Sequence, residues 1–513
     1  MGIKRYFASK DNTITNAFKE NLSTRGTGSN MGASDILETF VIHGQTTASV
    51  DLIPSAHNAA NAEQSRAIIQ FPVVDIQSDM GNGILPAQTG SVQFVLKMYN
   101  SPHGSTTPMS YSLDVCMVSQ SWNEGTGLDM DNYSDQGSSN WMKASSTQAW
   151  EDILSNPRTG ASFVEGENTS GSFHFETGIE NLSLDVSEQV YKWLDTNPDY
   201  SLPNNGFLVK LPDSIVSGSQ SYYTKKFFSR TSEFFFYRPV LEARWDSARK
   251  DNRGNFLVSS SLASGEDNLN TLYLYNVVRG QLTNIPTITE DKLHLSLYSG
   301  TTGPLGDRLA VINSAGESVT DITGGLLVEN GTEITGIYTA SFASTSSYDD
   351  VFDLWHTGSG TSHVQFFSGS LVPNDVRASE VLYDTEYTTT IQNLQSSYTS
   401  GQKPRLRIFA RNKDWSPNIY TVATRAIVPT IIEDAYYKVS RDIDGLDIVG
   451  YGTGSAVKDY TRLSYDVSGN YFEMDTSLLE PGYSYNIRLA YYLQGDYREQ
   501  PEIYKFRIKE DDV

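Results

Sequence analysis

The chain has 513 residues, of which 38% are hydrophobic and 19% charged, and its formal net charge is −23. This length exceeds what one hydrophobic core supports, so three or four domains are expected. The composition is rich in Ser, Thr, Asn and Gly, with 30 Tyr and 22 Phe, which is typical of many short strands and not of helical bundles. The acidic balance excludes a general nucleic-acid-binding protein, because phosphate contacts require clustered Lys and Arg.

Cysteine use and the terminal sequence predict where the chain folds. Cys116 is the single cysteine, so no disulfide forms within the chain, which favours folding in a reducing cytosol. Cys116 lies in an alternating run, which predicts a small core residue and not a reactive thiol. The N-terminus lacks the apolar run of a secretory signal, and no segment approaches the roughly 18 apolar residues that span a bilayer. We therefore expect no membrane partner.

The first 35 residues consist mainly of Lys, Asn, Ser, Thr and Gly with scattered Phe, and end in Arg25-Gly-Thr-Gly-Ser-Asn-Met-Gly. A stretch of this composition buries too little apolar surface to fold by itself. We interpret residues 1–35 as an extended N-terminal arm, either a flexible terminus or a segment that becomes ordered on a neighbouring subunit.

From 36 to 247 the hydrophobic pattern has a period of two. Residues Val92, Phe94, Leu96 and Met98 fall on one face of a strand, and the run from Tyr111 to Met117 repeats the pattern. Turn clusters rich in Gly, Asn, Asp and Pro separate these runs. Further strands are predicted at Ala67–Phe71, Gly206–Leu211 and Phe234–Trp245.

One amphipathic helix interrupts the strands. In the run from Asp185 to Leu194, four apolar residues fall at i, i+4, i+7 and i+8, as a one-sided helix requires. Asp185 or Ser187 can cap its N-terminus, and Pro198 prevents its continuation. We expect this helix to cover one end of a β-sandwich.

A charged break, Asp246-Ser-Ala-Arg-Lys-Asp-Asn-Arg-Gly-Asn, follows Trp245 and marks a domain boundary. Strands spaced about ten residues apart then predict two immunoglobulin-like β-sandwich domains, over 255–373 and 374–513. The predicted strands of the last domain are Tyr387–Ile391, Arg405–Ala410, Tyr436–Ser440, Tyr460–Tyr465, Tyr483–Leu493 and Ile503–Ile508. The fold class is therefore all-β: an N-terminal jelly-roll sandwich over 36–247, followed by two immunoglobulin-like sandwiches.

Several short pieces between 36 and 247, in their order and spacing, resemble the DNRLRE-type domain, a jelly-roll module of bacterial surface and phage proteins. The pieces are Ser112-Leu-Asp-Val, Trp122-Asn-Glu-Gly, Ser139-Asn-Trp141, Trp150, Gly160, Tyr191-Lys-Trp193-Leu, Asn204-Asn-Gly-Phe-Leu-Val-Lys210, Lys226-Phe-Phe-Ser-Arg230 and Arg238-Pro239-Val-Leu. The stretch Leu128–Ser138 departs from the family pattern as an insertion. The resemblance implies a jelly roll with a role in a bacterial or phage surface structure.

The C-terminal half is similar to immunoglobulin-like modules in virion proteins of contractile-tailed marine phages. The similarity rests on Asn412-Lys-Asp-Trp-Ser-Pro and Leu463-Ser-Tyr-Asp-Val-Ser-Gly-Asn-Tyr-Phe. It implies a structural component of a tailed bacteriophage virion, in the neck, tail or baseplate region, that is assembled in the host cytoplasm.

No motif for catalysis or cofactor binding is recognised, so no catalytic, cofactor-binding or metal-binding residue is predicted. The seven histidines lack the paired spacing of a zinc site, and His356 and His363 are the closest two. The acidic loop Asp129–Asp135 places oxygen ligands at alternating positions, but it lacks the Gly and terminal Glu of a calcium loop. We interpret it as a surface loop, with structural calcium as the alternative.

Three tryptophans raise a second possible function. Trp122, Trp141 and Trp150 lie beside Gly and Asn, and such indoles either stack on sugar rings or fill the end of a sandwich core. We favour packing, and Trp355 and Trp415 pose the same question. The preferred function is a non-enzymatic virion component that contacts other virion proteins and copies of itself. A carbohydrate-binding adhesin is the alternative, and a polysaccharide-degrading enzyme is a weaker third.

Overall fold

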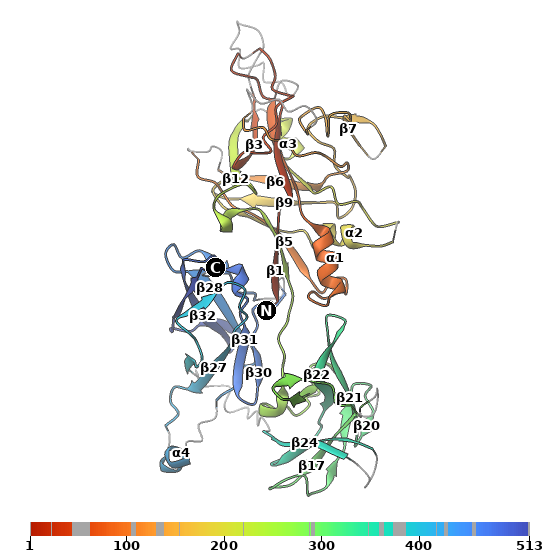
Figure 1. The fold of residues 1–513 in the computed structure, drawn as a ribbon, viewed down its shortest axis with the longest axis vertical. Coiled ribbons are helices and arrows are strands. Elements are labelled where there is room, and N and C mark those ends of the chain that lie inside the picture. The colour runs from red at the N-terminus through yellow and green to blue at the C-terminus, as the bar shows by residue number, and fades with distance from the viewer. Residues whose placement is uncertain are drawn as a thin grey trace. The chain divides into compact units, whose positions relative to one another are not determined.

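The computed structural model of the chain is all-β, with 44% strand and 8% helix, as the composition predicts. It describes residues 2–510 except 22, 44–61, 104–108, 130–137, 153, 198, 219, 287, 289–292, 347, 359–363, 373–385, 417, 425–428 and 454–457. The chain divides into two compact units, Ile3–Trp245 and Asp246–Val513 (Figure 1). The first unit ends two residues before the predicted boundary at 247.

The first unit contains two main antiparallel sheets. In the first sheet the order is β1 (Ile3–Phe7), β13 (Val240–Arg244), β5 (Gln93–Met98) and β10 (Leu182–Asp185). In the second sheet the order is β12 (Tyr222–Phe228), β3 (Ile36–Ile42), β4 (Glu63–Gln70), β11 (Phe207–Lys210), β6 (Tyr111–Met117) and β9 (Ser170–Phe175), with β2 (Lys10–Thr15) paired to β4.

This strand order is that of a jelly roll. The eight strands β1-β13-β5-β10 and β4-β11-β6-β9 form two four-stranded sheets, and most connections cross from one sheet to the other. Strands β2, β3 and β12 extend the second sheet. The predicted jelly-roll sandwich is therefore confirmed.

The core lies between the two sheets, where period-two strands direct alternate side chains inward. Phe94, Leu96 and Met98 of β5 are fully buried there, together with the inward residues of β6, so the face predicted from Val92 to Met98 is confirmed. Cys116 is also buried, as predicted.

The arm predicted over 1–35 is wrong for both of its halves, since Asn30 and Met31 are also buried and hydrogen-bonded to Ser139 and Asn12. Ile3–Phe7 pairs along its whole length with β13, and Lys10–Thr15 pairs with β4 from Gln70 to Ser65. Strand β2 was missed because its buried residues are mostly polar: Asn12 and Thr13 are buried, and their partners are distant in sequence. A polar segment folds where hydrogen bonds compensate its burial, which composition does not reveal.

Helices are few and short. α2 (Ser187–Leu194) confirms the predicted helix, and Asp185 accepts hydrogen bonds from the N–H and hydroxyl of Ser187. The other helical segments are α1 (Val73–Gly81), α3 (Asp213–Val216), α4 (Ile419–Thr424), η3 (Phe235–Tyr237), η4 (Asn252–Gly254) and η5 (Thr476–Leu478). In the described part of the chain, none is long and apolar enough to cross a membrane.

The strand predicted over Phe234–Trp245 begins only at Val240. Phe235–Tyr237 form the turn η3, and Pro239, which lacks an N–H, stands directly before β13. Aromatic residues in this run therefore mark a turn and not a strand.

The second unit begins with a sandwich whose strands belong to one continuous sheet. Its strands are β20 (Ser318–Val319), β19 (Val311–Asn313), β22 (Thr332–Ala343), β21 (Ile322–Glu329), β17 (Leu293–Ser299), β23 (Val351–Thr357), β24 (Val364–Leu371), β14 (Asn270–Tyr275) and β18 (Arg308–Leu309), beside the hairpin β15 (Val277–Val278) and β16 (Gln281–Leu282). β21 pairs with β17 up to Gly324 and with β22 from Gly325, so it passes between the two layers. An immunoglobulin sandwich would have two separate sheets here.

The last sandwich has two separate sheets. One contains β25 (Tyr387–Ile391), β27 (Arg405–Asn412), β31 (Gly469–Glu473) and β30 (Ser464–Asp466). The other contains β26 (Ser397–Thr399), β34 (Tyr504–Lys509), β32 (Ser484–Leu493), β28 (Ala435–Arg441) and β29 (Asp447–Val449), with β33 (Asp496–Glu499) on β32. When β25, β27, β28, β30, β31, β32 and β34 are lettered A to G in chain order, the first sheet has the order A-B-E-D and the second contains the order G-F-C. These are the two sheets of an immunoglobulin-like sandwich.

Candidate functional site

A long excursion between β6 and β9, residues 119–169, covers the outer face of the second jelly-roll sheet. Its three tryptophans pack with Ile14, Ile68 and Leu208 of the sheet in a separate apolar cluster. These three sheet residues alternate with the residues that face the main core. The excursion therefore gives the sheet a second, smaller core on its outer side.

The indoles are buried, as predicted for packing. Trp150 is 0% exposed, and its Nε1 donates to Asn140 O at 2.7 Å. Trp122 is 3% exposed and donates to Asn205 O at 2.8 Å. Buried ring faces leave no surface on which a sugar can stack, so these tryptophans do not form the sugar platform that an adhesin would need.

Gly160 allows the excursion to close on Trp141. It has φ +73°, and a Cβ at this position would lie 2.7 Å from the indole. Its carbonyl accepts from Arg66 Nη1 at 2.9 Å, and the Arg66 guanidinium lies over the same indole, 5.1 Å from the ring centre. Trp141 is thus held between Gly160 and Arg66.

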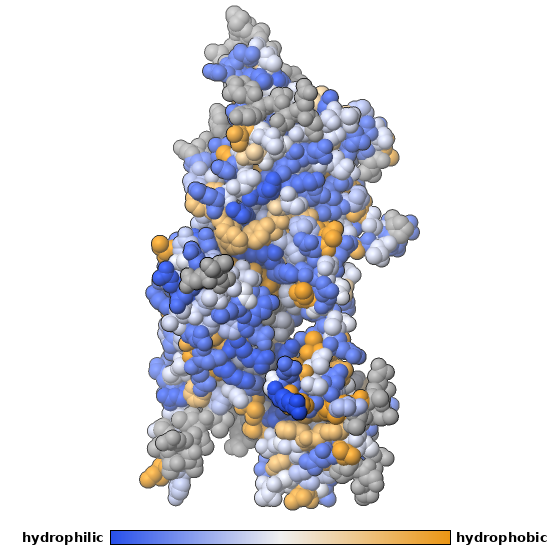
Figure 2. Space-filling view, viewed as in Figure 1, coloured by the Kyte–Doolittle hydropathy of each residue, from blue (hydrophilic) through white to orange (hydrophobic). Residues whose placement is uncertain are grey.

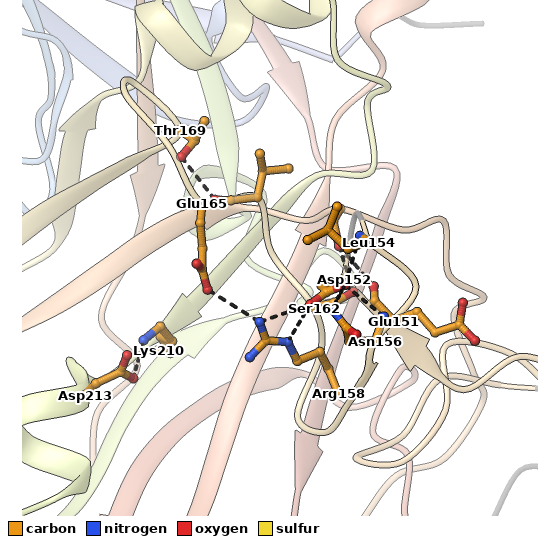
Figure 3. A network of polar contacts seen from close by, with 12 residues as sticks. Glu151, Asp152, Leu154, Asn156, Arg158, Ser162, Glu165, Thr169, Lys210 and Asp213 are labelled. Atoms are coloured by element: carbon orange, nitrogen blue, oxygen red, sulfur yellow. Dashed lines mark hydrogen bonds and ion pairs between the residues drawn. The ribbon is translucent and has the colours of Figure 1, made fainter.

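A polar network fixes the hairpin of β7 (Trp150–Glu151) and β8 (Pro157–Arg158) at the tip of the excursion (Figure 3). The Asp152 carboxylate accepts from the main-chain N–H groups of Leu154 and Asn156 and from the side chains of Asn156 and Arg158. The Asn156 side chain is the main cause that lowers the pKa of Asp152 to about 2. The network closes the turn of this hairpin.

A second polar cluster joins β2 to the start of the excursion. The N–H of Arg230 donates to Asp11 Oδ2 at 2.7 Å, and the N–H of Asp11 donates to Glu124 Oε1 at 2.8 Å. The Arg230 side chain binds Glu124 through Nε and Nη2 at 2.7 and 2.6 Å. Asp11 Oδ1 is buried and has no hydrogen-bond partner among the described residues. Burial, reinforced by Glu124, raises the pKa of Asp11 from 3.8 to about 7 against the opposing effect of Arg230.

This shift predicts a pH-dependent stability. Because the folded chain holds the Asp11 proton more tightly than the unfolded chain, the first unit should lose stability as pH rises from about 4 to 7. Asp11→Asn keeps an oxygen that accepts from the Arg230 N–H but does not titrate. The difference in the free energy of unfolding between pH 5 and pH 8, measured with urea, should therefore be smaller in this variant. Asp152→Asn is the control, because its pKa lies below this range. An unchanged slope in Asp11→Asn would contradict the prediction.

The second unit brings His294 and His356 together, with ring centres 5.8 Å apart on neighbouring strands β17 and β23. Ser296 Oγ donates to Asp321 Oδ1 at 2.6 Å and lies 2.8 Å from His356 Nε2. Arg308 contacts both Ser296 and Asp321. The sequence did not reveal this cluster, since only the strand register places these residues side by side.

This cluster lacks the geometry of a nucleophilic triad. A triad requires histidine between serine and carboxylate, one on each ring nitrogen. Here Ser296 Oγ and Asp321 Oδ1 both contact the same ring nitrogen of His356, Nε2, at 2.8 and 3.4 Å. Ser296 is also fully buried. The arrangement is that of a hydrogen-bonded structural cluster.

Among the described residues, no group of three or more His, Cys, Asp or Glu side chains could hold a metal ion. Most of the acidic loop Asp129–Asp135 lies outside the described residues, as do His57 and His363. The calcium alternative for this loop stays a prediction.

One edge strand of the first sandwich in the second unit has an unusual composition. β24 (Val364–Leu371) pairs with β23 alone among the described strands, and its eight residues carry no charge. Val364 is 61% exposed and Phe367 38%. Natural edge strands are usually protected by Lys, Pro or shortness, because their free N–H and C=O groups bind other strands.

Several other edges among the described strands do carry such protection. β1 contains Lys4 and Arg5, and β33 contains Asp496, Arg498 and Glu499. The free side of β14 is occupied: Asn252 accepts from the N–H of Thr271 at 3.0 Å, and Arg253 donates to Tyr273 O at 3.3 Å. β9 and β25 are also uncharged edge strands, of 6 and 5 residues, but β24 is longer, with 8. The β24 edge, residues 364–370, is therefore the best candidate for an interaction site.

Hydrophobic side chains gather on the surface of the domain that carries β17, β22 and β24 (Figure 2). Exposed apolar residues of this domain include Val278, Val328, Val364 and Phe367. No model of a protein family and no curated protein matches this chain. The site is therefore assigned from its own geometry.

Proposed function

We propose that the protein is a structural component of a tailed-phage virion, in the neck, tail or baseplate region. Its role is assembly through protein–protein contacts, with no turnover of a substrate. The observation that carries the proposal is the uncharged, exposed edge of β24, which offers backbone hydrogen bonds and apolar side chains together. The sequence resemblances to phage modules support the same assignment.

The occupant that we assign to this edge is β24 of a second copy. Two-fold pairing brings two identical strands together, so any charge on the strand would enter the interface twice with the same sign. β24 avoids this repulsion although the chain has a net charge of −23. An edge with no charge is therefore the part of this acidic molecule at which identical copies approach most readily.

A charge placed on the edge tests this assignment. We expect the full chain to associate with rising concentration in sedimentation velocity, and Val364→Lys to stay monomeric, because each copy would then bring a lysine, the residue that commonly protects natural edge strands, into the pairing edge. Val278→Lys is the matched control: it charges another exposed valine, 50% exposed against 61% for Val364, in the β15–β16 hairpin.

Val278→Lys should associate as the unchanged chain does. A chain that stays monomeric at all concentrations, or a Val364→Lys variant that associates fully, would contradict self-pairing at β24. A strand from a different protein would then be the partner to seek in particles.

A further inference from the structure

Residues 249–256 of the second unit lie in the charged stretch that the sequence predicts as a domain boundary. Polar side chains of this segment are nevertheless buried: Asp251, Asn252 and Asn255 are only 4, 5 and 6% exposed. Buried polar groups of this kind are retained where hydrogen bonds compensate their removal from water. The partners of the segment therefore show what it does in the fold.

The first half of the segment pairs with the last sandwich. The N–H of Tyr465, in β30, donates to Arg249 O at 3.0 Å, and the N–H of Asp251 donates to Tyr465 O at 3.1 Å. Lys250 and Tyr465 thus form a parallel bridge, and the N–H of Arg249 donates to Ser464 Oγ at 3.0 Å. Because β30 is the end strand of its sheet, the segment adds a short strand to that sheet.

The second half of the segment belongs to the sandwich of β14–β24. The N–H of Val372, directly after β24, donates to Arg253 O at 2.9 Å, and the N–H of Phe256 donates to Val372 O at 2.9 Å. The Phe256 ring is fully buried in the core of that sandwich. The chain therefore passes from the sheet of one sandwich into the core of the other within residues 249–256.

Two side chains of the segment contact both sandwiches at once. Asn252 Oδ1 accepts from the N–H of Thr271 in β14 at 3.0 Å, while its Nδ2 donates to the Tyr465 hydroxyl at 3.3 Å. Arg249, whose main chain pairs with β30, binds the carboxylate of Glu329 at the end of β21 through Nε and Nη2. Such two-bond arginine–carboxylate pairs fix orientation as well as distance.

The segment also packs closely against the last sandwich. A Cβ on Gly254 would lie 2.9 Å from Ile431 Cδ1 and 3.1 Å from Val467 Cα, so no larger side chain fits there without movement. Asn255 Nδ2 donates to Glu433 Oε1 at 2.6 Å. A hinge needs residues that are free to change their backbone angles, and these contacts hold the segment on both sides.

We propose that residues 249–256 are a strap that locks the two sandwiches of the second unit into one rigid body, where a flexible linker is the usual connection between domains. The strap holds the β24 edge at a fixed place relative to the last sandwich, whichever protein pairs with that edge. Both surfaces are then presented in one geometry, which lowers the entropy that association costs.

Pulsed electron paramagnetic resonance of the full chain measures whether the two sandwiches move relative to each other. Nitroxide labels are attached at Thr323→Cys in β21 and Thr390→Cys in β25, which are exposed strand positions. Cys116 is buried and should stay unlabelled. We expect a single narrow distribution of distances between the labels. A broad distribution with the strap unchanged would overturn the proposal, and this measurement needs no strap variant to fold.

Strap variants then test which contacts fix the sandwiches. Arg249→Met with Asn252→Ala removes the side-chain contacts to both sandwiches and should broaden the distribution by roughly twofold or more. Gly254→Val should also broaden it, because its side chain has no room against the last sandwich. Arg441→Met is the matched control: it removes a two-bond pair with Asp444 inside the last sandwich and should leave the width unchanged. An unchanged width in both strap variants would show that the strap does not hold the sandwiches together.

Discussion

Replacing Arg253 by methionine is expected to destabilise the second-unit sandwich of β14–β24 by about 3–5 kcal/mol, the usual loss when one partner of a buried ion pair is removed. Arg253 Nη2 lies 2.6 Å from Asp353 Oδ2, and Asp353 is 0% exposed. Without the guanidinium, the carboxylate would keep, among the described residues, the neutral donors Trp355 Nε1 and Gly369 N–H. Hydrogen exchange of β23 peptides, read beside calorimetry, measures the loss.

The surroundings of Arg253 explain why water cannot replace it. Its guanidinium lies 5.0 Å from the ring centre of Phe367 and donates to Tyr273 O, so it fills the gap between β24 and β14. Arg253→Met with Asp353→Asn should recover part of the loss, because Asp353 then carries no charge, while the buried Asp251, 3.7 Å from Arg253, still loses its cation. Arg405→Met, which removes an exposed partner of Glu473, is the control and should cost under about 1 kcal/mol. Equal losses in the two single variants would contradict the account.

Trp150→Ala is expected to cost about 3–5 kcal/mol in the first unit, as removal of a fully buried indole usually does. The change opens a cavity in the cluster of Trp122, Trp141 and Ile68 and leaves Asn140 O without its donor. Because this cluster fastens the excursion 119–169 to the outer sheet face, exchange should rise throughout the excursion. Urea unfolding and hydrogen exchange measure the two effects.

Trp415 supplies the comparison for Trp150. It is 37% exposed, so Trp415→Ala should change stability by less than about 1 kcal/mol. If the excursion exchanged its amide hydrogens as slowly in Trp150→Ala as in the unchanged chain, the apolar cluster of the three tryptophans would not be what holds the excursion on the sheet. Such a result would also return the indoles to consideration as a mobile sugar-binding platform.

Sequence periodicity predicted the jelly-roll strands where one face is buried. The alternation from Val92 to Met98 needs no knowledge of partners, since a half-buried strand repeats every two residues. The same holds for the helix ending at Leu194. Runs of aromatic residues were less reliable, because Phe235–Tyr237 form a turn before Pro239.

Segments stabilised by polar contacts could not be predicted in this way. Asn12 is buried because its Nδ2 donates to Ser139 O and Oγ, and Asn30 Nδ2 donates to the same carbonyl. These partners lie more than a hundred residues away along the chain. Hydrophobic pattern carries no signal for such bonds, so residues 1–35 are interpreted from the sequence as an arm.

The candidate sites depend on register for the same reason. His356 meets Ser296 through the pairing of β17 and β23, and Asp321 meets Ser296 through the pairing of β17 and β21. The β24 edge is different: its lack of charge is visible in the sequence. That it lies at an edge is visible only in the sheet order.

The assignment as a virion component is tested most directly by quantitative mass spectrometry of particles purified from the cells that produce the protein. We predict that the protein is present at a fixed copy number per particle, a multiple that matches the symmetry of a neck, tail or baseplate. Val364→Lys should lower that number or prevent assembly. Absence of the protein from intact particles, or trace amounts that vary between preparations, would contradict the account.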